Sequence, residues 1–163
     1  MVGKEPDIGP TARTVANNLN RLRADQKMNY TELSERLEAR AGWTINAVGI
    51  RRIESGERRV TPDDLVALAL ALGVSPVTLL MPETADRDEP VVATGLEKAW
   101  PAEDLWKWLR GDGPLSAKRD FDELIDFMQR AVPAWRRQEW TEGVAKIIEL
   151  NIQELDRQSD GDN

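Results

Sequence analysis

The chain has 163 residues, of which 22 are Lys or Arg and 29 are Asp or Glu, so its formal net charge is −7 at pH 7. This length allows one domain of ordinary size or two small ones. Cys and His are absent, which excludes disulfides, thiolate nucleophiles, imidazole bases and zinc-finger ligand sets. We therefore expect no metal, no cofactor and no enzymatic activity.

The hydropathy and charge patterns separate the chain into two halves. Its longest apolar run spans only residues 65–74, about half of the roughly 20 residues that cross a bilayer. Residues 1–10 lack the apolar region of a signal peptide, so we expect a cytoplasmic protein without a membrane partner. Residues 1–82 contain 11 basic and 10 acidic side chains, whereas residues 83–163 contain 11 basic and 19 acidic side chains. This asymmetry indicates that the two halves have different roles.

The first predicted elements are an arm and a helix. Residues 1–10 contain two glycines, two prolines and no apolar period, which predicts a flexible arm. Thr11 is expected to cap a helix that ends near Ala24 and presents Val15 and Leu19 on one face.

Two short helices are predicted next. Asn29 is followed three positions later by Glu32, the spacing of a capping box, which predicts a helix that continues to about Ala39. Asn46 is expected to cap a third helix, and Gly56 is expected to end it in the left-handed conformation.

The fourth and fifth helices have strong start signals. Thr61 supplies a capping hydroxyl, Pro62 occupies the first helical position, and two acidic residues follow. Residues 65–72 are apolar almost all round, which predicts a central position in a bundle before Gly73 ends the helix. Ser75 and Pro76 then predict a fifth helix that ends near Met81.

The remaining residues predict a second module. Five of the ten residues 83–92 are charged, which is typical of a linker between a domain at 11–82 and a Trp-rich α-helical module at 93–157. Residues 158–163 are expected to form a disordered tail. Helices are expected over residues 101–110, after a Ser116 cap, and from Pro133 onward. No segment has the alternation of a confident strand, so the predicted fold class is all-α.

Two short helices, a turn and an Arg-rich helix with a glycine stop form the layout of a DNA-reading helix-turn-helix. The signature residues are Leu22-Arg23, Asn29-Tyr30-Thr31-Glu32-Leu33, Ile50-Arg51-Arg52-Ile53-Glu54-Ser55-Gly56 and Asp64-Leu65 to Leu72-Gly73-Val74. Through these residues the chain resembles the phage-repressor or Xre-like (Cro/CI-type) helix-turn-helix family over residues 12–82. The resemblance implies a five-helix, lambda-repressor-like domain and double-stranded DNA as the partner.

The resemblance also implies a set of contact residues. Those expected to face base edges are Arg52, Arg51, Ala47, Val48 and Gly49. Those expected to contact phosphates are Asn29, Tyr30, Arg58 and Arg59. Arg52 is the best candidate base reader, because a guanidinium can bond guanine O6 and N7 together. The alternative is that the arginines form an ordinary solvated face balanced by Glu54 and Glu57.

Two structural features belong to the same resemblance. It implies a buried ion pair between Arg23 and Glu54, so that Glu54 is a structural residue and not an acid–base catalyst. The segment 37–54 is about six residues longer than the family's tight turn. Within it, Trp43 is expected to act as a hydrophobic plug under the turn, the alternative being a wedge into DNA.

The C-terminal module is the predicted place of assembly. Five of the six Trp residues lie beyond the linker, which favours a Trp-filled small core, a dimerisation surface, or both. The residues expected on a pairing seam are Trp140, Val144, Ile148 and Leu155. We expect a homodimer that binds an inverted-repeat operator, because paired recognition helices lie about 34 Å apart.

Taken together, these features favour a sequence-specific DNA-binding transcriptional regulator that acts as a repressor and reads the major groove with residues 46–54. The alternative is a protein-interaction adaptor or antitoxin-like protein that acts on a protein partner through the acidic C-terminal module. The two differ in retention on random DNA at low salt, which only the regulator should show. A self-cleaving Ser-Lys domain is not expected, because the C-terminal half has no strand pattern.

Overall fold

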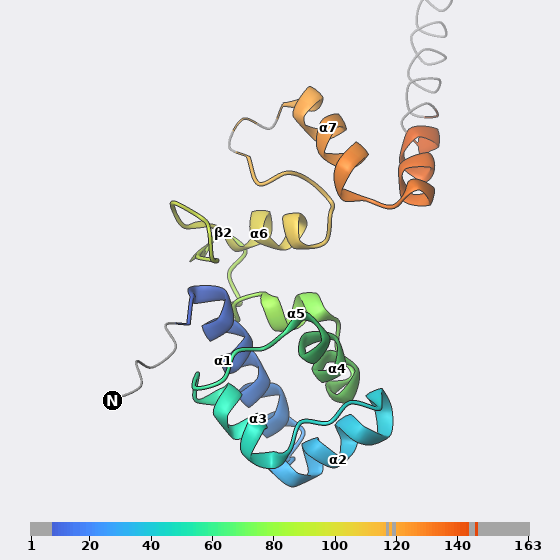
Figure 1. Cartoon of the computed structure of the whole chain (residues 1–163). Helices are drawn as coiled ribbons and strands as arrows, with labels where there is room; N and C mark the ends of the chain where they lie inside the picture. The colour runs from blue at the N-terminus through green and yellow to red at the C-terminus, as the bar shows by residue number, and fades with distance from the viewer. Residues whose placement is uncertain (1–7, 117, 119, 144–145, 147–163) are drawn as a thin grey trace, which may run out of the picture. The chain divides into compact units, whose positions relative to one another are not determined.

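A computed structural model describes residues 8–116, 118, 120–143 and 146, and these residues are mainly helical (Figure 1). The elements are α1 (Pro10–Asp25), α2 (Tyr30–Ala41), α3 (Ala47–Glu54), α4 (Pro62–Leu72), α5 (Pro76–Leu80), β1 (Pro90–Val91), β2 (Trp100–Pro101), α6 (Ala102–Leu109) and α7 (Phe121–Ala131). The all-α fold class predicted from the sequence is confirmed. None of the helices in the described ranges is both long and apolar enough to cross a membrane.

The helix starts follow from local capping chemistry. Asn29 accepts from the backbone N–H of Glu32 while the Glu32 carboxylate accepts from the N–H of Asn29, which completes the predicted capping box of α2. Thr61 and Asp64 form the same reciprocal arrangement at α4. Gly42 ends α2 with a φ of 57°, a left-handed conformation that glycine adopts without a Cβ penalty.

The first helix begins earlier than predicted. Pro10 occupies its first position and Gly9 is the N-cap, because proline has its φ already fixed for a helix and lacks the N–H that would need a partner. The predicted cap Thr11 lies inside the helix, and its hydroxyl accepts from the backbone N–H of Thr94.

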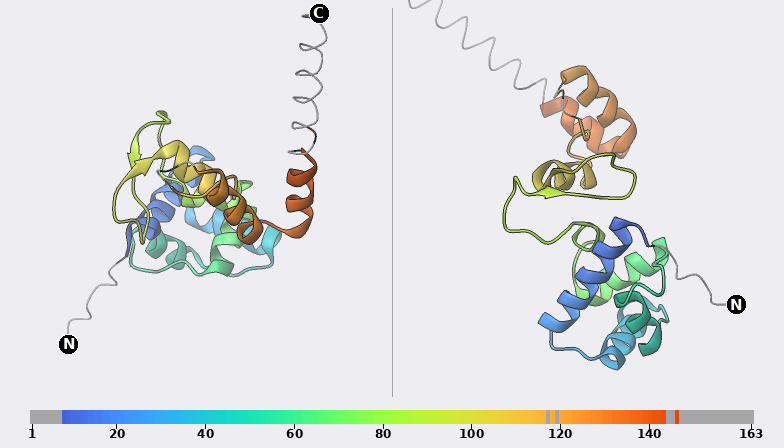
Figure 2. Two further views of the ribbon diagram at one scale, coloured as in Figure 1. Left: turned by 90° about the horizontal axis from the view of Figure 1, so that it is seen from above. Right: turned by 90° about the vertical axis from the view of Figure 1, so that its left-hand side faces the viewer.

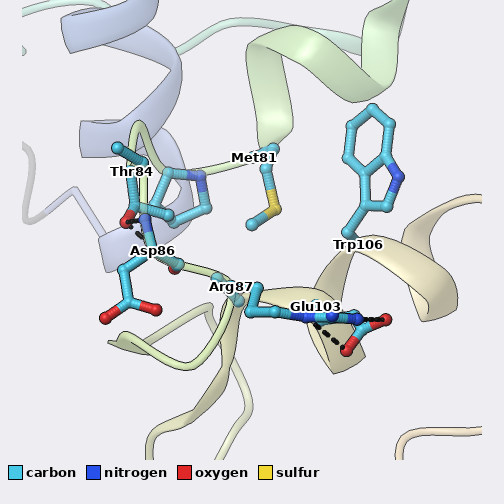
Figure 3. Close-up of a pocket in the computed structure, with 9 residues that line it drawn as sticks. Met81, Thr84, Asp86, Arg87, Glu103 and Trp106 are labelled. Carbon is cyan, nitrogen blue, oxygen red and sulfur yellow. Dashed lines mark hydrogen bonds and ion pairs between the residues drawn. The ribbon is translucent and has the colours of Figure 1, made fainter.

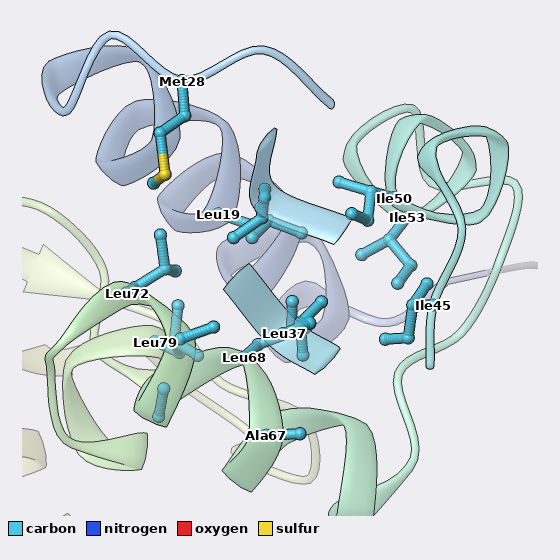
Figure 4. Packing of buried hydrophobic residues seen from close by; sticks show 13 residues of the cluster. Leu19, Met28, Leu37, Ile45, Ile50, Ile53, Ala67, Leu68, Leu72 and Leu79 are labelled. Atoms are coloured by element: carbon cyan, nitrogen blue, oxygen red, sulfur yellow. The ribbon is translucent and has the colours of Figure 1, made fainter. Parts of the chain in front are cut away.

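Five helices, α1 to α5, enclose one hydrophobic core (Figures 1 and 2). Figure 4 shows Leu19 of α1, Leu37 of α2 and Leu68 of α4 among the buried side chains that meet at its centre. The expectation of a fully central fourth helix is only partly right. Val66 and Leu70 on its outer face are 50% and 54% exposed, because the other helices cover only the opposite side of α4.

A short segment after α5 belongs to the same compact unit. β1 pairs with β2 in antiparallel orientation, with Val91 opposite Trp100. Val91 and Leu105 are buried in a second, small cluster, and α6 contacts α5. The chain divides into units at residues 1–110 and 111–163. The domain boundaries expected from the sequence, with a linker at 83–92, differ from this division and stay a prediction.

The second unit contains α7 and a helical stretch at residues 134–143. Asp120 caps α7, whereas the predicted cap Ser116 donates its hydroxyl proton to Glu123. Ser116 lies five residues before the helix and so bonds a side chain of its first turn without being the N-cap. Met128 is buried, but Trp135 is 64% exposed. The Trp135 side chain therefore does not contribute to the Trp-filled core expected from the sequence.

Candidate nucleic-acid interface

The third helix separates an apolar face from an exposed basic face. Ile50 and Ile53 are fully buried against the core, whereas Val48, Arg51 and Arg52 are exposed. The spacing i, i+3 and i+4 places these three residues on one side of the helix. Asn46 caps the helix by accepting from the N–H of Gly49. The packed side of α3 thus fixes which side chains reach solvent.

The five residues predicted to face bases differ in their surroundings. Val48 is 58% exposed, and Arg52 lies 3.6 Å from the carboxylate of Glu57 in an exposed ion pair. Ala47 is half-buried. Gly49 is also half-buried, and a Cβ on it would lie 2.9 Å from Ile45 Cγ2. A side chain at position 49 would therefore point into the fold and not toward a ligand on the exposed face.

The four residues predicted to contact phosphate lie at two places in the fold. Asn29 and Tyr30 are at the start of α2, where the side-chain oxygen Oδ1 of Asn29 accepts from two backbone N–H groups. The Tyr30 ring lies beneath the guanidinium of Arg23, 4.3 Å from carbon Cζ to the ring centroid. Arg58 and Arg59 follow α3 in the loop that leads to α4, and Arg59 is the more exposed of the two.

The Arg23–Glu54 ion pair implied by the resemblance is present and almost fully buried. Arg23 Nε lies 2.7 Å from Glu54 Oε1 and Nη2 lies 2.8 Å from Oε2, a bidentate pairing. The side chains are 12% and 4% exposed. The hydrogen bond to Glu54 raises the pKa of Arg23 above its ordinary value, against the effect of burial. Because every oxygen of Glu54 is bonded, this carboxylate joins α1 to α3.

A second buried carboxylate was not anticipated from the sequence. Asp64, whose side chain is 3% exposed, accepts from Trp43 Nε1 at 2.9 Å and from Arg58 Nη2 at 3.1 Å. Burial alone would raise the pKa of Asp64, but the hydrogen bonds from Trp43 and Thr61 and the charge of Arg58 hold the pKa below its ordinary value. Its capping role was readable from Thr61, whereas no local spacing signals a partner 21 residues away.

The lengthened turn between α2 and α3 is held by side-chain hydrogen bonds. Ser34 donates to the carbonyl of Ile45 at 2.8 Å, and Thr44 donates to Glu38 at 2.6 Å. Ile45 is buried. The expected buried plug at Trp43 is wrong, because this ring is 38% exposed and is anchored through its indole N–H to Asp64. The hydrogen bond to Asp64 therefore orients a Trp43 side chain that is partly in solvent.

Two hollows lie elsewhere in the first unit. One, of about 460 Å³, is bordered by Met81, Trp106 and the ion pair between Arg87 and Glu103 (Figure 3). The other, of about 360 Å³, is mainly apolar and includes Arg59 in its lining. Within the described part of the chain, no group of His, Asp or Glu side chains could hold a metal ion.

The predicted pairing seam falls mostly outside the described residues. Val144, Ile148 and Leu155 lie there, and only Trp140, which is half-buried, is described. The role of these four residues stays a prediction.

Comparison with known families gives one match. Residues 19–79 match the family model described as Helix-turn-helix, a range that runs from within α1 to α5. Neither the curated proteins nor the solved structures contain a match to this chain.

Proposed function

We propose that this protein is a sequence-specific transcriptional regulator that acts as a repressor. The premise is that residues 19–79 are a helix-turn-helix domain of the Xre, Cro and CI type. A domain of this type implies DNA as the partner. The observation that carries the proposal is the exposed face of α3. There Val48, Arg51 and Arg52 project from a helix whose opposite face is locked into the core by Ile50 and Ile53.

The chemistry of this face supports a role in reading the major groove. The major groove is about 12 Å wide and admits one helix. The Arg52 guanidinium can donate two parallel hydrogen bonds to guanine, and Val48 can contact a thymine methyl. The ion pair of Arg52 with Glu57 is exposed and loosely spaced at 3.6 Å, so its loss on binding costs little. Arg51 supplements the contact set.

We assign the phosphate contacts to two segments, the start of α2 and the loop after α3. Asn29 and Tyr30 begin α2, whose N-terminus carries a partial positive charge that favours phosphate. Arg58 and Arg59, in the loop after α3, are the other proposed phosphate contacts. Such contacts position the protein without reading sequence.

The proposed working form is a homodimer on an inverted repeat. Two recognition helices related by a two-fold axis match half-sites one helical turn apart. The exposed Trp135 of the second unit supports a role of that unit in pairing, because aromatic residues are enriched at protein–protein interfaces. Trp140, Val144, Ile148 and Leu155 are the proposed seam.

Selection from a random duplex pool tests the function. The full-length protein should enrich a repeat with half-sites about one turn apart, and Arg52→Ala should relax the base preference at one position of each half-site. Arg59→Ala is the matched control, since it also removes one arginine but should weaken binding to all sequences and reduce the salt slope by about one. Failure of the wild type to enrich any sequence refutes the proposal. Repression itself is tested by transcription in vitro from a promoter that carries the enriched repeat.

A protein partner is the second candidate function. The charge of residues 83–163 is −8, from 11 basic and 19 acidic groups, and Phe121 and Trp135 are 58% and 64% exposed. An acidic surface with exposed aromatic rings suits an adaptor or antitoxin-like role toward a basic protein. Retention on random DNA at low salt that falls steeply as salt rises supports the regulator, and no retention at any salt concentration supports the adaptor.

A further inference from the structure

The carboxylate of Asp64 joins three segments that are separate in sequence. It lies in the first turn of α4, and its partners are Trp43 in the turn before α3 and Arg58 in the loop after α3. Thr61, the N-cap of α4, supplies a third donor through its backbone N–H at 3.1 Å. The segments on both sides of α3 are therefore fastened to the same residue of a neighbouring helix.

The contacts of Arg58 extend this connection to α3 itself. A Cβ placed on Gly49 would lie 3.0 Å from Arg58 Nη1 and 3.3 Å from the side-chain oxygen Oδ1 of Asn46. The guanidinium thus lies against the first turn of α3, in space that the absence of a side chain at position 49 leaves open. Its other terminal nitrogen, Nη2, is held by Asp64 at 3.1 Å.

These contacts have the properties of a rigid support. The Asp64 side chain is almost fully buried and each of its oxygens is bonded, so its orientation is fixed. A charge-assisted hydrogen bond in a dry environment is stronger than a neutral one in solvent. By contrast, simple capping of α4 needs only the Thr61 N–H, and the donors from Trp43 and Arg58 add nothing to that function.

We propose that Asp64 is a positioning residue for DNA recognition, which sets the orientation of α3 by holding Trp43 from the segment before the helix and Arg58 from the segment after it. The inference rests on the proposed function, because it concerns how that helix reads bases. Base readout requires hydrogen bonds of fixed direction, whereas phosphate contacts tolerate small displacements. Loss of the support should therefore lower affinity for a preferred sequence more than affinity for DNA in general.

Three variants separate this role from capping and from charge. Asp64→Asn keeps the size of the side chain but replaces one acceptor oxygen with an NH2 donor, which must face either Trp43 or the donors of Arg58 and Thr61. Asp63→Asn makes the same change of charge at the exposed neighbouring acid. Thr61→Ala removes the capping hydroxyl of α4 but leaves the contacts of Asp64 with Trp43 and Arg58 in place.

The measured quantity is the ratio of affinities for the duplex selected by the wild type and a scrambled duplex of the same composition. Asp64→Asn should lower this ratio by about tenfold, roughly the loss of one well-formed base contact. Asp63→Asn and Thr61→Ala should keep it within about twofold, at a temperature where circular dichroism shows every variant folded. Trp43→Phe, which removes only the indole donor, should lower the ratio by a smaller factor.

The outcomes are distinct. An unchanged ratio in Asp64→Asn overturns the inference, and so does an equal loss in Thr61→Ala, because that result would trace the effect to fraying of α4. A wild type that prefers no duplex refutes the proposed function and the inference with it. The NMR signal of the Trp43 indole N–H supplies a check without DNA. Slow exchange with solvent in the wild type, accelerated in Asp64→Asn, supports the tether, and rapid exchange in both contradicts it.

Discussion

Removal of the Glu54 carboxylate tests the buried junction between α1 and α3. In Glu54→Ala, two nitrogens of Arg23 and the amide of Asn20 lose acceptors that lie at 2.6–2.8 Å. Breaking a buried ion pair by removing one partner costs about 3–5 kcal/mol. The lower end applies here, because Arg23 is 12% exposed and keeps both its bond to the Met28 carbonyl and its contact with the Tyr30 ring.

A loss of about 3 kcal/mol corresponds to a fall in Tm of roughly 12–24 °C for a domain of this size. Urea and thermal denaturation followed by circular dichroism measure both quantities. Glu57→Ala is the matched control, since its ion pair with Arg52 has both side chains 54% exposed and should contribute less than about 1 kcal/mol. Equal losses in the two variants would refute the reasoning. A double variant, Arg23→Met with Glu54→Leu, should recover most of the loss, because apolar replacement of both partners leaves no buried charge.

Three further predictions concern other sites. Gly49→Ala should destabilise the protein by about 1–2 kcal/mol in urea denaturation despite the better helix propensity of alanine, because the added Cβ meets two side chains at 2.9 and 3.0 Å; a gain in stability would contradict this packing. The Asn18 amide donates to three backbone carbonyls at the end of α5, so Asn18→Ala should destabilise the protein by about 1–3 kcal/mol. Asn18→Asp should destabilise it more, because a carboxylate would repel these carbonyls. Lys107 and Arg87 lower the pKa of Glu103 from 4.5 to about 2, so the stabilisation from this pairing is present above pH 4.5 and is lost as the pH falls toward 2; a carboxyl NMR titration should show the low midpoint, and Lys107→Ala should raise it.

The helix boundaries of the first unit were predictable because their signals are local. A capping box joins residues three positions apart, as at Asn29 and Glu32, so the sequence alone contains both partners. A glycine after an apolar period marks a left-handed helix end, as at Gly73 with its φ of 72°. The error at α1 has the same origin, since two adjacent start signals compete and Pro10 prevails over Thr11.

The exposed face of α3 was also predictable, in part. Once Ile50 and Ile53 are assigned to the core, a period of 3.6 residues leaves Arg51 and Arg52 in solvent. The half-buried state of Gly49 was not predictable, because it depends on Arg58, which approaches from the following loop.

The remaining features were decided by contacts between segments far apart in the chain. Trp43 bonds Asp64 across 21 residues and Asn18 bonds the end of α5 across about 60. Residues 83–110 join the first unit through Val91, Leu105 and the contact of α6 with α5, although the charged composition of residues 83–92 is typical of a linker. Local patterns determine where a helix begins and which of its faces is apolar. Which buried polar group meets which donor depends on how those helices pack, and a buried carboxylate such as Asp64 persists only where packing brings its partners to it.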